Sequence, residues 1–207
     1  MQIMVLADEA IEQELENKKL NDSIKVIFIK SSSEIINDAN TAALFILKEE
    51  INIEEIKDFG SKPVFINSTI HTLKELGVPE NFSRINGWPT FVNREIWEIA
   101  TSRQDDVKYI FGELGWKFIK VADQPGLVSA RIISMIINEA YFALGEDVSS
   151  KDEIDVAMKL GTNYPYGPFE WSKKIGLNRV YSLLEKLSET DRCYGTAPAM
   201  KNELLTH

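Results

Sequence analysis

The chain has 207 residues, of which 44% are hydrophobic and 27% are charged, a composition typical of a globular protein with one large or two small cores. Its 32 acidic and 23 basic residues give a formal charge of −9, which argues against a nucleic-acid-binding surface, because phosphate binding needs clustered Lys and Arg. No apolar run approaches the roughly 20 residues that span a bilayer, and no secretory signal pattern is present. The one cysteine, Cys193, permits neither an internal disulfide nor a cysteine-ligated zinc site. A cytoplasmic protein that binds neither nucleic acid nor membrane is expected.

Residues 1–123 alternate short apolar runs with helical segments, which is the pattern of an α/β domain. The runs are rich in Ile, Val and Phe, as strands buried on both faces of a parallel sheet tend to be. The expected strands are Gln2–Leu6, Ile24–Ile29, Ala42–Leu47, Pro63–Ile66 and Trp116–Val121, with a further pair at Phe82–Ile85 and Phe91–Ile99. The expected helices are Ala7–Leu20, Ile53–Asp58 and Arg103–Leu114, the last of which ends at Gly115.

Residues 124–207 carry helical patterns and no further strand-like run, so they are expected to form a second domain. Pro125 and Gly126 mark the boundary. Apolar residues recur at helical spacing from Leu127 to Leu144, and Gly145 is the expected end of that helix. The later expected helices are one that opens with the capping box Ser150/Glu153 and ends at Gly161, one at Pro168–Lys174 and one at Leu177–Leu187, followed by a polar tail.

The second domain also contains an ordered series of short motifs. They are Pro125-Gly126-Leu127, Asn138-Glu139-Ala140, Glu153-Ile154-Asp155, Met158-Lys159-Leu160-Gly161 and Pro165-Tyr166-Gly167-Pro168-Phe169-Glu170. This series resembles the C-terminal helical domain of the 3-hydroxyacyl-CoA dehydrogenase family. The resemblance implies a Rossmann-type N-terminal domain, NAD-dependent oxidation of an L-3-hydroxyacyl-CoA, and a homodimer that forms through the helical domain. The apolar residues of Leu127–Leu144 cover more than one face of its helix, which supports the dimer.

The turn after the first expected strand departs from the pattern of a dinucleotide site. Such sites place a glycine-rich loop and a helix N-terminus against the pyrophosphate. In this chain the corresponding positions are Leu6, Ala7 and Asp8, and the turn and following helix start contain no glycine. Side chains therefore occupy the space of the pyrophosphate, and Asp8 with Glu9 and Glu12 places negative charge beside it. No bound cofactor is expected.

The end of the second expected strand departs from the family in the same way. The resemblance implies an acid that binds the ribose hydroxyls there, and Lys30 stands in its place. A lysine at that position could favour the 2′-phosphate of NADP, so NAD or NADP remains an alternative. The family also inserts a helical excursion after this strand that carries part of the CoA contact. Only Ser31–Asn40 separates Lys30 from the next strand, which leaves no room for it.

In the family, two positions of the implied catalytic set hold a general base and the acid that orients this base. Aligning Ile96–Ile99 on the family places Glu98 at the orienting glutamate and Asn86 where the family has its histidine. Asn86 cannot accept a proton near neutral pH. His71, about one helical turn beyond Asn67, is a possible replacement base, and a place in the first turn of a surface helix is the alternative. Glu98 is more simply a leftover strand carboxylate.

In the family, the side chains at the remaining implied positions bind the substrate oxygen. The family's Asn-Thr-Ser segment corresponds to Asn67, Ser68 and Thr69, which keeps a hydroxyl at the third position. The asparagine that the family supplies from the second domain is replaced by Ala130. Half of the four catalytic roles therefore lack their side chain.

Three functions remain open. The first is a family member without normal NAD-dependent turnover that acts as a ligand-binding or partner subunit. The second is an active NAD(P)-dependent dehydrogenase of 3-hydroxyacyl-CoA or a related hydroxy acid, with cofactor and base in unusual positions. The third is a protein that binds another small ligand or carries out other chemistry.

Overall fold

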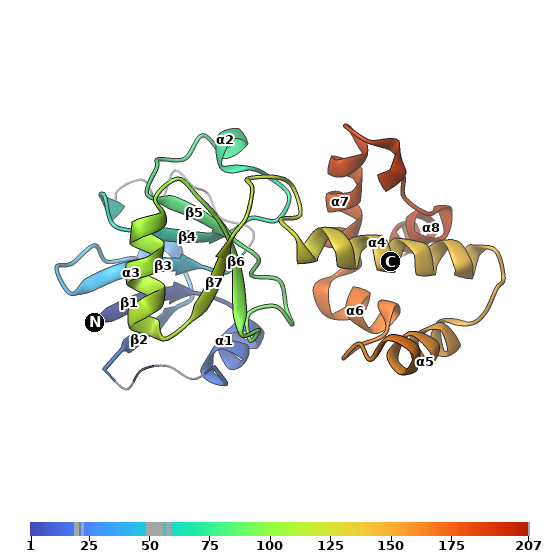
Figure 1. Cartoon of the computed structure of the whole chain (residues 1–207), viewed down its shortest axis with the longest axis horizontal. Helices are drawn as coiled ribbons and strands as arrows, with labels where there is room; N and C mark the ends of the chain where they lie inside the picture. The colour runs from blue at the N-terminus through green and yellow to red at the C-terminus, as the bar shows by residue number, and fades with distance from the viewer. Residues whose placement is uncertain (19–20, 22, 49–55, 57–58, 207) are drawn as a thin grey trace. The chain divides into compact units, whose positions relative to one another are not determined.

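The computed structural model describes residues 1–18, 21, 23–48, 56 and 59–206. The chain divides into two compact units, Met1–Leu127 and Val128–His207 (Figure 1). The first is built on a β-sheet and the second from helices. Each is described by itself.

The first unit contains a seven-stranded sheet over its described residues. The strands are β1 (Gln2–Leu6), β2 (Lys25–Ile29), β3 (Thr41–Ile46), β4 (Val64–Asn67), β5 (Phe82–Ile85), β6 (Ile96–Thr101) and β7 (Lys117–Lys120), in the spatial order β2-β1-β3-β4-β5-β6-β7. Neighbouring strands are parallel except for β5 and β6. The order reverses between β1 and β3, and open α/β sheets bind ligands at the carboxyl ends of the strands at such a point. The crevice after β1 is therefore the default place for a ligand.

Both faces of this sheet are buried. Residues alternate between the faces along each strand, so Ile3 and Val5 pack on one side while Met4 and Leu6 pack on the other. The first face carries α1 (Glu9–Glu16) and α3 (Gln104–Leu114), and the second carries α2 (Leu73–Leu76) at its margin. Gly115, with φ 71°, ends α3 as the sequence predicts, because glycine adopts this left-handed conformation without strain.

Lys18, just after α1, is an unusual cation within the first face. Its ammonium lies 5.0 and 5.5 Å from the ring centroids of Trp97 and Trp116, which stack on each other at 5.3 Å. It also donates to the backbone oxygens of Val92 and Arg94. Burial lowers the pKa of Lys18 to about 8, and the nearby carboxylate of Glu95 opposes this shift. The aromatic pair and the two carbonyls therefore hold a partly desolvated charge.

We expect this lysine to make the stability of the first unit depend on pH. Below about pH 8 both the folded and unfolded chains keep the proton, so the cost of burying the cation is complete. Between about pH 8 and pH 10.5 the folded chain releases the proton first, so the free energy of unfolding rises. Lys18→Met should abolish this rise in urea unfolding, whereas Lys108→Met on the exposed side of α3 should keep it. An unchanged pH slope in Lys18→Met would contradict the expectation.

The second unit is a bundle around α4. Its elements are α4 (Ser129–Gly145), α5 (Lys151–Thr162), α6 (Pro168–Ile175), α7 (Leu177–Ser188) and α8 (Pro198–Thr206), with a short 3₁₀ turn at Arg192–Tyr194. Helix α4 packs against α6, α7 and α8, and Ile137, Leu184 and Met200 are among the fully buried side chains. Over the residues described, no helix is both long enough and apolar enough to cross a membrane.

The last helix corrects the sequence analysis, which predicts a polar tail after Leu187. Helix α8 is held to α4 by the buried amide of Asn138. This amide donates to the Gly195 carbonyl at 2.9 Å and accepts from the Ala197 N–H at 2.9 Å. Met200 then fills the core. The tail is helical because it satisfies a buried polar group that lies far back in the sequence.

Other boundaries also differ. Helix α4 ends at Gly145 as predicted, and α5 ends at Thr162, one residue after the predicted Gly161. The left-handed residues that follow the two helices are Asp147 and Asn163 and not the glycines. Asn and Asp tolerate this conformation better than other side chains. The predicted strand at Phe91–Ile99 begins only at Ile96, since residues 91–95 form turns. The predicted helix Ala7–Leu20 ends at Glu16, and the predicted helix at Ile53–Asp58 falls almost wholly outside the described residues.

The turn between α5 and α6 is fixed by a buried carboxylate. Asp155, which is 7% exposed, accepts hydrogen bonds from the N–H groups of Phe169 and Glu170 at 2.8 and 3.0 Å. The carboxylate therefore caps the N-terminus of α6 from a neighbouring helix. A Cβ at Gly167 would lie within 2.4 Å of Asp155 atoms, so only glycine fits there.

Gly167→Ala should therefore destabilise the helical unit. The new methyl group must displace the Asp155 carboxylate from its two N–H partners, at a cost of about 1–3 kcal/mol. Gly161→Ala is the matched control, because a Cβ there meets nothing within 4 Å. That change lies inside α5 and should be neutral or stabilise by up to about 1 kcal/mol. Thermal unfolding followed by circular dichroism measures both, and equal melting temperatures for the two variants would refute the packing argument.

Candidate functional site

The turn after β1 is closed by the chain itself. Asp8 is the N-cap of α1, and its Oδ1 accepts a hydrogen bond from the Ile11 N–H at 2.9 Å. Ala7 is buried at 1% exposure, and Glu9 and Glu12 lie in the first helical turn. A helix N-terminus is a natural anion site, and here a carboxylate of the same chain already serves it. This turn does not fit a pyrophosphate.

An ion pair lies beside this turn. The Lys30 ammonium, after the end of β2, contacts the carboxylate of Glu12 on α1. Hydrogen bonding to Glu12 raises the pKa of Lys30, and the charges of Glu9 and Asp8 act in the same direction. The Lys48 ammonium donates to the Lys30 carbonyl at 2.7 Å. A 2′-phosphate at this strand end would have to displace Glu12 from Lys30.

Asn67 joins three strand ends at the same edge of the sheet. It is 6% exposed; its amide donates to the Leu47 carbonyl at 3.1 Å and accepts from the Gly87 N–H at 2.9 Å. A Cβ on Gly87 would lie 2.9 Å from Asn67 Cβ, so the two chain segments are in the closest contact possible. The Asn67 amide therefore hydrogen-bonds to the backbone on both sides of β4.

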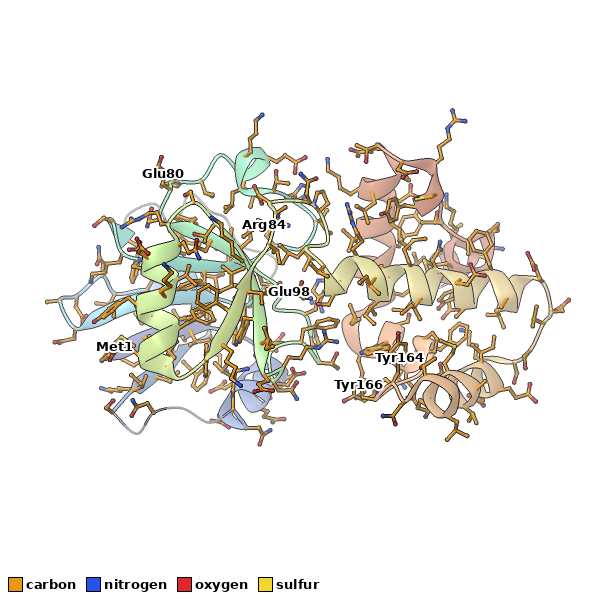
Figure 2. The ribbon with its side chains drawn as sticks, in the orientation of Figure 1. Met1, Glu80, Arg84, Glu98, Tyr164 and Tyr166 are labelled. Carbon is orange, nitrogen blue, oxygen red and sulfur yellow. The ribbon has the colours of Figure 1, made fainter. Side chains whose placement is uncertain are left out.

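Asn86 and Glu98 lie at the end of the antiparallel pairing between β5 and β6. Ile85 pairs with Ile99 in the antiparallel ladder, and Asn86 and Glu98 are the next residues along the two strands. Asn86 is 4% exposed, and its side-chain oxygen accepts from the Trp88 N–H at 3.2 Å. Glu98 is half-buried on β6 (Figure 2). On the β5 side, Asn86 offers no titratable base.

Three of the other predicted site residues, Ser68, Thr69 and His71, lie in the segment after β4. Thr69 is 2% exposed, and its hydroxyl has no hydrogen-bond partner in the described structure. The Ser68 hydroxyl donates to the His71 carbonyl at 2.9 Å. His71 is exposed and lies just before Thr72, the N-cap of α2, so it precedes the first turn of the helix that the sequence analysis assigns to it. Ala130 belongs to the second unit, where it is buried on α4.

Sequence reasoning misses the largest polar group at this edge, Arg84. Its side chain is fully buried on β5, donates to the Ser68 carbonyl at 2.8 Å and pairs with Asp123 at 2.5 Å (Figure 2). Longer bonds reach the carbonyls of Thr69 and Gln124. Burial lowers the pKa of Arg84, and the hydrogen bond that Arg84 donates to Asp123 opposes that shift. An arginine within an otherwise buried strand was the available signal, because a buried charge needs a partner.

Arg84→Met should strongly destabilise the first unit. The change leaves Asp123 and three backbone carbonyls without their donor, and loss of one partner of a buried pair costs about 3 kcal/mol or more. The control is Arg103→Met, because the pair of Arg103 with Asp106 at 2.8 Å is partly exposed and worth about 0–1 kcal/mol. Urea unfolding of the two variants measures the difference. A loss below about 1 kcal/mol in Arg84→Met would show that the network contributes little.

No cluster of His, Cys, Asp and Glu in the described ranges could hold a metal ion.

Comparison with known proteins identifies the second unit. The family model of the 3-hydroxyacyl-CoA dehydrogenase C-terminal domain matches residues 126–206. The helical unit therefore carries the C-terminal domain of the 3-hydroxyacyl-CoA dehydrogenase family, which the sequence analysis predicts. A segment of 79 residues, 38% of the chain, is 46% identical to 3-hydroxyadipyl-CoA dehydrogenase of Escherichia coli K12. Another of 91 residues, 43% of the chain, is 38% identical to a probable 3-hydroxybutyryl-CoA dehydrogenase of Bacillus subtilis.

These matches span only 17% and 32% of the two relatives. The similarity of the fold extends further. The structure of (S)-3-hydroxybutyryl-CoA dehydrogenase from Ralstonia eutropha superimposes with a TM-score of 0.73 at 20% identity, over 99% of this chain and 93% of the other. That of 3-hydroxybutyryl-CoA dehydrogenase from Escherichia coli K12 gives 0.59 at 29% identity, over 69% and 31%. The predicted fold class, a Rossmann-like α/β unit followed by a helical unit, is confirmed.

Proposed function

We propose that this protein is a 3-hydroxyacyl-CoA dehydrogenase-family member that lacks normal NAD-dependent turnover and acts as a ligand-binding or partner subunit. The observation that carries the proposal is the Asp8 carboxylate, which accepts the Ile11 N–H at 2.9 Å where a dinucleotide would place its pyrophosphate. A bound cofactor would have to displace this cap and bring two phosphates beside Glu9 and Glu12.

The position of the general base supports the same proposal. Oxidation of a hydroxyl requires a group that takes up the hydroxyl proton, and Asn86 has no basic nitrogen. Glu98 remains on the neighbouring strand, so the orienting group is present without the group it would orient. The absence of both a glycine turn for the cofactor and a general base fits a protein that keeps the family's fold without its NAD-dependent turnover.

A homodimer that forms through the helical unit is part of this proposal. Large apolar side chains are exposed on three of its helices: Ile132 on α4 at 52%, Val156 and Leu160 on α5 at 50% and 83%, and Leu205 on α8 at 85%. We take these side chains as candidates for the dimer surface. We further propose a cytoplasmic location.

The alternative is an active NAD(P)-dependent dehydrogenase of 3-hydroxyacyl-CoA or a related hydroxy acid. Thr69 favours it, because its buried hydroxyl has no partner in the described structure and could hold a substrate oxygen. Glu98 would then have to act as the base itself. This arrangement would still need a cofactor position away from the closed turn after β1.

We expect NADH at millimolar concentration to leave the melting temperature of the purified chain unchanged. A ligand at 100 times its dissociation constant would stabilise the folded state by about 2.7 kcal/mol, so even weak binding is visible. No NAD-dependent oxidation of 3-hydroxybutyryl-CoA is expected either. The double change Asn86→His and Ala130→Asn should not restore turnover, because the loss lies at cofactor binding. A thermal shift with NADH or NADPH, or turnover by the unmodified chain, would favour the alternative.

A further inference from the structure

A pocket of about 380 Å³ lies within the helical unit, in the size range of small-molecule sites. Residues of α4, α5, α6 and α8 line it, together with Leu177 at the start of α7. Two aromatic rings meet there edge to face, Tyr141 of α4 and Phe169 of α6, with ring centroids 5.0 Å apart. Both residues are buried, at 1% and 8% exposure. The pocket therefore presents an aromatic lining that the surrounding helices hold in place.

The chain places an ammonium group of its own beside these rings. The Lys151 nitrogen, at the start of α5, lies 5.5 Å from the centroid of the Tyr141 ring and 5.3 Å from that of Phe169. It also pairs with the carboxylate of Glu203 on α8 at 2.5 Å. Aromatic faces attract a cation at such distances, and the carboxylate adds a direct charge contact. The Lys151 ammonium therefore marks a position at which the pocket stabilises an organic cation.

The electrostatics of the helix do not account for this lysine. The N-terminus of a helix favours acids and disfavours cations, and the next two residues, Asp152 and Glu153, follow that rule. Lys151 opens the same turn with the opposite charge. Its pair with Glu203 is partly exposed, with side-chain exposures of 40% and 27%, and such a pair contributes little to stability. The pocket, and not the helix, favours a cation at this point.

The lining of the pocket is net negative. Four carboxylates and two ammonium groups line it, which gives a formal charge of −2. Two of the carboxylates are already bound, since Asp155 accepts two N–H groups at the start of α6 and Glu170 pairs with a lysine of α5 at 2.5 Å. The others are Glu203 and the exposed Asp152, and the exposed Lys173 is the second cation. The charge of the lining therefore favours a cation over an anion.

The hydroxyl of Tyr141 connects the aromatic pair to the carboxylate. It hydrogen-bonds to Ser172 and to Glu203. Burial raises the pKa of Tyr141 well above its usual range, so the phenol stays neutral and its ring remains available to a cation. Rings and carboxylate therefore form one site.

We propose that this pocket binds a small organic ammonium ion with an apolar stem. The ammonium group of the ligand takes the position of the Lys151 nitrogen between the two rings and Glu203, and the stem contacts Leu177. The Lys151 side chain is 40% exposed and flexible, so it turns into solvent when the ligand enters. Lys151 is thus an internal competitor for the site. The inference goes beyond the function proposed above and does not depend on it.

Titration with n-butylammonium, followed by the NMR shifts of the Tyr141 and Phe169 ring protons, tests the pocket. In Lys151→Ala the affinity should rise about tenfold, because the internal competitor no longer occupies the site. The control is Lys186→Ala, which removes the same charge from a lysine of α7 that pairs with Glu189. It should change the affinity by less than about twofold. Circular dichroism before the titration shows whether both variants are folded.

A second comparison separates recognition of the charge from apolar binding. In the Lys151→Ala chain, n-butylammonium should bind about tenfold more tightly than 1-butanol, which has the same stem without the charge. Adding Glu203→Gln should reduce this difference to less than about threefold, whereas adding Glu189→Gln should leave it unchanged. Equal affinities of the two probes in Lys151→Ala, or equal binding of n-butylammonium by Lys151→Ala and Lys186→Ala, would overturn the proposal. Lys151 would then be a structural contact between α5 and α8, and the function proposed above would be unaffected.

Discussion

The buried charge of Arg84 is the constraint on which the α/β unit depends. A guanidinium that is buried away from water needs hydrogen-bond acceptors for its N–H groups. The chain supplies these acceptors from the loop after β4 and from the segment after β7. Asp123 uses its two oxygens for Arg84 and for the Leu73 N–H, so the pair also fixes the start of α2. The Gly126 N–H then bonds to the Thr69 carbonyl at 2.6 Å. One cation thus sets the paths of several loops at the ligand-binding edge.

Other polar groups of that edge are satisfied in the same way, by the chain's own groups. Asp8 supplies the negative charge that a phosphate would bring, Glu12 holds Lys30, and Asn67 fills the approach to Gly87. The polar strand ends of this Rossmann-like sheet therefore find hydrogen-bond partners within the chain.

The sequence predicts the local features well and the long-range ones poorly. Strands β1 and β5 have the predicted bounds because short apolar runs between turn residues determine them. The absent glycines after β1 were equally visible, since that signal is contiguous. The partner of Arg84 lies 39 residues away, which no local pattern indicates. The predicted roles of His71 and Thr69 stay predictions. No local pattern indicates that Thr69 is buried while His71 is exposed.

The amide of Asn138 has a consequence for the order in which the molecule is made. Its acceptor and donor, Gly195 and Ala197, follow it by 57 and 59 residues. At about 5–20 residues per second, synthesis takes on the order of 3–12 s to deliver them. During that interval the Asn138 amide can hydrogen-bond only to water at these two positions. The bundle can close only when its last helix has left the ribosome, well after every strand of the sheet has been made.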